Sequence, residues 1–228
     1  MIDLGEKRMK KTICSLLLAG LITPVVVRAQ GTTYLSNLGN TSAGSVAIGS
    51  DAWIATPFFT GPNSSGYFLN SVQLRMGSAS GSPSGFSVLV YNNTGRIPAR
   101  GIGSLSGAEP TPGGTFIYTG SGMSLAPATL YFVVVTASTP IALGSYSWSY
   151  GNTTAYNSSD NWFMGPDYYT STDGSSWTSH LIQANPFQFA LNATAVPEPS
   201  SVALLCLGGP FLVARLLRSA KSKKDALS

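Results

Sequence analysis

The chain has 228 residues and a formal net charge of +4, but its basic residues are concentrated at the two ends. Residues 30–195 contain three arginines, five acidic residues and no lysine, which excludes a nucleic-acid partner held by clustered positive charge. The two cysteines, Cys14 and Cys206, lie in the terminal segments, so residues 30–195 have neither a disulfide framework nor a thiolate metal site.

Residues 1–29 have the pattern of a secretory signal peptide. A cluster of lysine and arginine at residues 7–11 precedes the almost wholly apolar segment 13–27, and Val27-Arg28-Ala29 places short side chains at the positions that a signal peptidase reads. The pattern predicts cleavage between Ala29 and Gln30. The alternative is an uncleaved amino-terminal anchor, which is disfavoured because the apolar run is shorter than the ~20 residues of a full span and Pro24 interrupts it.

Residues 30–192 predict one all-β domain, because short apolar or alternating stretches recur between turns rich in glycine, proline and asparagine. The predicted strands are 52–60, 67–76, 86–91, 115–118, 129–136, 145–150, 161–164 and 187–192. Residues 31–45 are either a loose leader or a first edge strand. The Asp173-Gly174 pair predicts a two-residue hairpin turn. With no helical pattern between strands, the sequence favours an antiparallel β-sandwich of jelly-roll type, and a closed barrel is the competing architecture.

This domain shows no recognisable catalytic set, so we expect it not to be an enzyme and to need no cofactor. His180 is the only histidine, and no Gly-x-Ser-x-Gly nucleophile motif is present. A glycan hydrolase using two of the few carboxylates is a distant alternative. The oxygen-rich loops with Asp160, Asn161, Asp167 and Asp173 leave calcium binding open, although solvated turn carboxylates explain these residues more simply.

Four aromatic side chains in the loop-rich region are candidates for contact with a glycan, because aromatic rings stack on the apolar faces of sugars. These residues are Trp162, Tyr168, Tyr169 and Trp177. We expect them to be more exposed than Trp53 and Trp148, which lie in strand-like stretches and are assigned to the core. The carbohydrate-binding interpretation depends on this exposure.

The carboxyl end combines three features in a fixed order. Residues 193–200 form a linker with the motif Val196, Pro197, Glu198 and Pro199, residues 201–217 are predicted to form a transmembrane helix, and residues 218–228 form a basic tail. The basic stop consists of Arg215, Arg218, Lys221, Lys223 and Lys224. The positive-inside rule places this tail in the cytoplasm, so the β domain is expected on the other side of the membrane.

The motif, the apolar run and the basic end together resemble the PEP-CTERM sorting signal of Gram-negative and related bacteria. The resemblance implies recognition by an exosortase, a membrane-embedded processing enzyme, which would act near Pro197, Glu198 and Pro199.

The body of the chain resembles the "choice-of-anchor" domains that precede such signals. The similarity is carried, in order, by Ala52-Trp53-Ile54-Ala55, Pro57-Phe58-Phe59-Thr60-Gly61, Val90-Tyr91-Asn92, Gly95-Arg96-Ile97-Pro98, Leu125-Ala126-Pro127-Ala128-Thr129-Leu130-Tyr131-Phe132 and Tyr146-Ser147-Trp148. The resemblance implies a β-sandwich surface module and supplies no catalytic residues.

From these features we expect a non-enzymatic protein that is secreted across the inner membrane of a Gram-negative-type bacterium. It would be anchored by its carboxyl-terminal helix, processed, and then reside at the cell surface or in the extracellular matrix. Its expected partners are the exosortase, the membrane and exopolysaccharide. A carbohydrate-binding module using exposed aromatics is the second interpretation, and a secreted glycan hydrolase is the third.

Overall fold

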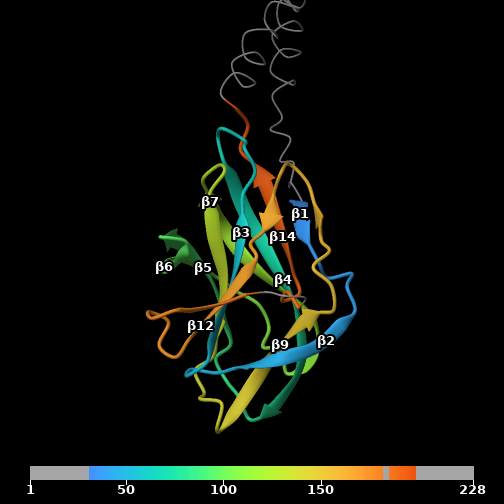
Figure 1. The fold of residues 1–228 in the computed structure, drawn as a ribbon, viewed down its shortest axis with the longest axis vertical. Coiled ribbons are helices and arrows are strands. Elements are labelled where there is room, and N and C mark those ends of the chain that lie inside the picture. Colours follow the sequence, from blue (N-terminus) through green and yellow to red (C-terminus); the bar gives the residue numbers. More distant parts are fainter. Residues whose placement is uncertain (1–30, 182–184, 199–228) are drawn as a thin grey trace, which may run out of the picture. The chain divides into compact units, whose positions relative to one another are not determined.

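The computed structural model describes residues 31–181 and 185–198. The predicted signal peptide, its predicted cleavage position at Ala29 and Gln30, Pro199, the predicted membrane span and the basic tail lie outside the described residues. Within the described ranges, no helix has the length and apolar character needed to cross a membrane. The described residues form two antiparallel sheets, which confirms the predicted all-β class (Figure 1).

The first sheet is organised around one long strand, β4. Its strands are β1 (Thr32–Ser36), β2 (Ser42–Ile48), β4 (Tyr67–Gly81), β7 (Pro112–Leu125), β9 (Gly144–Gly151), β10 (Asn157–Ser158) and β14 (Phe189–Ala195). Strand β4 pairs with β7 along most of its length, with β14 over residues 67–74 and with β9 over residues 76–81. Strand β14 lies between β4 and β1, so the last described strand is internal to the sheet.

The second sheet has the order β13-β12-β3-β8-β5-β6, and the short strand β11 also pairs with β3. Its strands are β3 (Trp53–Phe59), β5 (Ser87–Thr94), β6 (Ile97–Leu105), β8 (Leu130–Thr136), β11 (Phe163–Met164), β12 (Asp167–Ser171) and β13 (Thr178–Leu181). Strands β11 and β12 therefore share one edge of β3, with β12 opposite Trp53–Ala55 and β11 opposite Phe58 and Phe59.

The burial of strand β8 on both faces explains why its sequence is apolar without a break. All seven of its residues are buried. Successive side chains of a strand point to opposite faces, and here Val133 and Val135 join the main core while Phe132 and Val134 join a second, smaller cluster. Tyr169 of β12 belongs to this second cluster, and Trp177 packs against it. The prediction of a strand covered on both faces is confirmed.

All eight predicted strand segments overlap an observed strand. The structure adds β1, β2, β6, β10, β12 and β13, and it resolves residues 31–45 in favour of strands. Strand β14 continues to Ala195, so the sheet includes residues 193–195, for which the sequence predicts a linker. The two-sheet arrangement is sandwich-like, and the jelly-roll connectivity stays a prediction.

The tight two-residue turn lies in a different hairpin from the predicted one. Strands β12 and β13 do form a hairpin around Asp173-Gly174, but the last pair is Thr170 with Thr178, so the two-residue turn was wrong. The connection with two residues is Gly95-Arg96, between the paired Thr94 and Ile97. Both residues have positive φ, 61° and 70°, as the type I′ turn of a tight hairpin requires.

Candidate functional site

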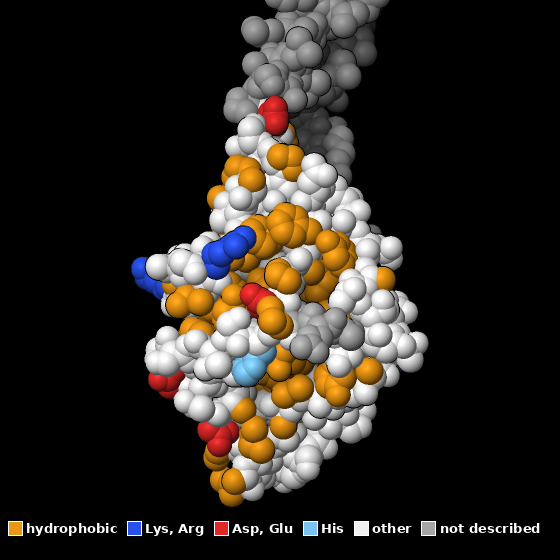
Figure 2. Space-filling model, viewed as in Figure 1, with side chains coloured by type: hydrophobic (Ala, Val, Ile, Leu, Met, Phe, Trp, Pro, Cys, Tyr) orange, Lys and Arg blue, Asp and Glu red, His pale blue; other side chains and the backbone are white. Residues whose placement is uncertain are grey.

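A hollow of about 190 Å³ opens on the face of the second sheet that carries the smaller apolar cluster. Its wall is mainly apolar, and two charged side chains, Arg96 and Asp167, complete it. The apolar wall consists of Pro57, Phe59, Leu130, Phe163, Pro166 and Tyr169, with Gly165 beside them. Figure 2 shows an arc of hydrophobic side chains around a depression, with blue and red side chains at its edge.

The alternation of β3 accounts for one side of the hollow. Phe58 points into the main core, so Pro57 and Phe59 point to the opposite face. The chain crosses from β11 to β12 directly over Pro57, where the Gly165 amide donates a hydrogen bond of 3.1 Å to the Pro57 carbonyl. A Cβ on Gly165 would lie 2.6 Å from the Pro57 ring, so only glycine allows this close crossing.

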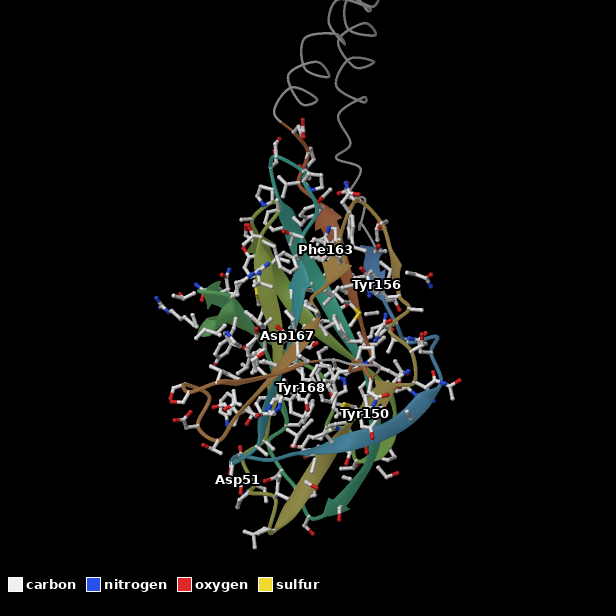
Figure 3. The ribbon with its side chains drawn as sticks, viewed as in Figure 1. Asp51, Tyr150, Tyr156, Phe163, Asp167 and Tyr168 are labelled. Atoms are coloured by element: carbon white, nitrogen blue, oxygen red, sulfur yellow. The ribbon has the colours of Figure 1, made fainter. Side chains whose placement is uncertain are left out.

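A stacked pair of aromatic rings, half-buried Phe59 and exposed Phe163, forms part of the hollow. The β11–β3 register places Phe163 opposite Phe59, and their rings stack with centroids 4.2 Å apart and planes 12° apart. Phe163 remains 43% exposed. The site therefore presents a flat apolar surface to solvent, and Figure 3 shows Phe163 and Asp167 on the same side of the molecule.

The charged residues lie close to Tyr169, which contributes its ring to the wall. The Tyr169 hydroxyl donates a hydrogen bond of 2.9 Å to the Arg96 carbonyl and so fixes the β5–β6 turn beside the hollow. Burial raises the pKa of Tyr169, the nearby Asp167 charge adds to this rise, and Arg96 opposes it. The Oδ1 atom of Asp167 is buried and accepts no hydrogen bond from any described residue. This carboxylate is therefore only partly satisfied by the protein.

The predicted exposure of Trp162 was wrong. Its side chain is 1% exposed and packs among three aromatic rings of the main core, Tyr34, Phe58 and Tyr67. The reason is the preceding turn, in which Asp160 and Asn161 both adopt positive φ and direct the chain inward. Trp162 has no surface to offer a glycan.

The other three aromatic candidates are also less exposed than expected. Tyr169 is 5% exposed and reaches the hollow only with part of its ring. Tyr168 is half-buried and stacks on His180, while Trp177 is half-buried against Tyr91. Trp148 is fully buried as predicted, whereas Trp53 is half-buried. Three residues of the hollow were not predicted from the sequence, although the apolar side chains at alternate positions 57 and 59 of β3 were the available signal: Phe59, Phe163 and Arg96.

Several polar residues singled out in the sequence have local partners. The Nε2 atom of His180 lies 2.8 Å from the Thr170 hydroxyl within the β12–β13 hairpin. The Asp173 Oδ1 accepts amide hydrogen bonds from Ser175 and Ser176, of 2.8 and 2.9 Å, which hold the pKa of this carboxyl well below its usual value. Among residues 31–181 and 185–198, no three His, Cys, Asp or Glu side chains gather in a group that could hold a metal ion.

The described part of the predicted sorting motif is attached to the loop between β3 and β4. The Val196 amide donates to the Gly66 carbonyl at 3.0 Å, and the Asn63 side-chain amide donates to the Val196 carbonyl at 3.2 Å. The Ser64 hydroxyl donates to Glu198 Oε1 at 3.0 Å. Pro197 and Glu198 are nevertheless exposed. The motif thus begins directly at the end of β14, without an intervening free linker.

A scan against protein-family models found no match, and neither did searches of curated proteins and of solved structures.

Proposed function

We propose that this chain is a non-enzymatic surface or matrix protein that is exported, anchored by its carboxyl-terminal segment and processed by an exosortase at a PEP-CTERM-type signal. The observation that carries the proposal is the position of the motif. Pro197 and Glu198 are exposed immediately after the final strand, where a processing enzyme can reach the backbone without unfolding the sheet.

The composition of the β domain supports this location. It has no lysine and few charges, and it folds into two sheets without cysteine. A weakly charged surface rich in short hydroxyl side chains suits a hydrated polysaccharide environment, because it attracts polyanions little. In this proposal the sandwich is a choice-of-anchor type module of jelly-roll connectivity, displayed at the surface of a Gram-negative-type bacterium.

The proposal is tested by intact-mass measurement and cell fractionation of the protein from its native host. We expect a mature mass that lacks residues 1–29 and everything beyond the Pro-Glu-Pro region, in a fraction that co-purifies with extracellular polysaccharide. Recovery of the full-length polypeptide from the cytosol, with both ends intact, would refute the proposal.

Two variants separate recognition of the motif from its attachment to the domain. Glu198→Gln removes the charge but keeps an oxygen that can accept the Ser64 hydrogen bond. Ser64→Ala removes that hydrogen bond and leaves the motif unchanged. We expect Glu198→Gln to accumulate unprocessed protein in the membrane fraction and Ser64→Ala to be processed normally. Normal processing of Glu198→Gln together with a block in Ser64→Ala would contradict recognition of the motif.

A further inference from the structure

We propose that the hollow beside Phe163 binds one neutral pyranose ring of an extracellular polysaccharide. This inference rests on the proposed function, because only an exported domain meets such a polymer. Of the four aromatic residues predicted from the sequence, the site includes only Tyr169, since Trp162 is in the core and neither Tyr168 nor Trp177 lines the hollow.

The apolar part of the site suits the face of a sugar ring. Phe163 is 43% exposed and is supported from behind by its stack on Phe59, so its ring is held in one orientation. A pyranose presents a face of C–H groups that packs on such an aromatic surface. The volume, about 190 Å³, is smaller than the 300–1,000 Å³ of typical ligand pockets and so fits one ring, with the neighbouring sugars outside.

The polar part of the site suits hydroxyl groups. Asp167 lines the hollow, and its side chain is half-buried, so part of it remains open to a ligand. Sugar hydroxyls are donors to such a carboxylate, and the Arg96 guanidinium supplies donors for the hydroxyl oxygens. The site therefore offers an apolar surface to the C–H face of the sugar ring, and one acceptor and one donor group to the hydroxyls at the edge of the ring.

The backbone at Arg96 supports a role for its side chain. Its φ of 70° lies in the left-handed region, which glycine or asparagine adopts more readily than arginine. The strained residue is held by the hydrogen bond from Tyr169, whose ring is part of the same wall. Arginine is conformationally unfavourable at this positive-φ turn position. Its presence beside a cavity is expected where the side chain is needed for binding.

A neutral sugar is favoured over an acidic one by charge. Residues 31–198 carry three arginines against six acidic residues, so the domain repels uronate polymers as a whole. A second hollow, of about 340 Å³ beside Trp53, is a weaker candidate. Two of its polar groups already have partners, since Asp51 accepts the Ile141 amide and the Trp53 indole donates to the Ser50 carbonyl.

The test is calorimetric titration of the full chain, in a polyoxyethylene detergent that contains no sugar, with neutral hexasaccharides of glucose, mannose, galactose and N-acetylglucosamine. A polyglucuronate oligomer is the charged comparison. We expect saturable binding of at least one neutral hexasaccharide that Phe163→Ala weakens at least tenfold. The matched control is Phe68→Ala, because Phe68 is 41% exposed on β4 of the other sheet. It should leave the affinity within twofold of wild type.

Two further variants test the polar contacts. Asp167→Asn should weaken binding severalfold. Arg96→Gly should also weaken binding severalfold while leaving the melting temperature equal or higher, because glycine suits the backbone conformation at this position. A stable Arg96→Gly variant with full affinity would remove Arg96 from the site.

Three results would overturn the inference: no binding of any neutral hexasaccharide, binding of polyglucuronate alone, or binding that Trp53→Ala abolishes and Phe163→Ala does not. These results concern only the sugar site. A processed, exported protein that fails to bind sugars refutes the site and leaves the proposed function standing, whereas a cytosolic full-length protein refutes the proposed function whatever the calorimetry shows.

Discussion

The burial of Trp162 next to the exposed Phe163 provides a direct test of this structure. Trp162→Ala removes a ring that is 1% exposed and stacked between Tyr34 and Phe58, with centroid distances of 5.0 and 5.9 Å. Large-to-small replacement of a buried tryptophan costs about 3–5 kcal/mol, and the stacking of this indole on two neighbouring rings places the expected cost near the middle of that range, at about 4 kcal/mol. This is a large part of the total stability of about 5–15 kcal/mol that is typical of a domain.

Phe163→Ala is the matched comparison, since it removes the next side chain along the chain. Phe163 is 43% exposed and stacks on one ring only, so we expect a cost of about 1 kcal/mol. The free energy of unfolding is measured for the full chain by guanidinium denaturation, followed by circular dichroism in the presence of detergent. A difference between the two variants below about 1 kcal/mol, or a larger cost for Phe163→Ala, would refute the placement of Trp162 in the core.

Two other predictions concern turns. Gly61→Ala would place a Cβ against the Asp160 carbonyl oxygen, far inside van der Waals contact, and should destabilise the fold by about 1–3 kcal/mol. The control is Gly39→Ala, whose added Cβ would have nothing within 4 Å. In thermal melts this control should be neutral or slightly stabilising. Equal melting temperatures for the two variants would argue against the close approach at Gly61. The pKa of the Asp173 carboxyl is lower in the folded state than in the unfolded state, so the ionised carboxylate stabilises the fold at any pH above the usual pKa of an aspartate. This stabilisation is lost as the pH falls through the pKa of the folded state. The melting temperatures of wild type and Asp173→Asn should therefore differ at pH 7 and converge in strong acid, and a gap that stays constant from pH 7 to pH 2 would contradict this reasoning.

Local sequence patterns predicted eight of the observed strands because each of these carries its own signal. The alternation of buried and exposed residues in β4 and the unbroken apolar run of β8 reflect one and two covered faces, respectively. The orientation of Trp162 was not predictable in this way. It depends on the positive φ of Asp160 and Asn161, which neither residue type requires.

The candidate site was less predictable than the fold because it is assembled from distant segments. Phe59, Arg96 and Phe163 come from β3, the β5–β6 turn and β11, which the sheet brings together. Nothing in the sequence indicated that Arg96 takes a left-handed conformation beside a cavity. The pairing of β11 with β3 could not be predicted from the sequence, and the register of this pairing is what places Phe163 opposite Phe59.

The internal position of β14 has a mechanical consequence. A pull on the chain beyond Glu198 acts along a strand that is hydrogen-bonded to β4 on one side and to β1 on the other. Such a load shears two ladders together instead of peeling bonds one at a time, and the hydrogen bonds of Glu198 and Val196 with the 63–66 loop meet the force first. A tether fixed at this end of the chain therefore resists drag and flow better than one joined to an edge strand.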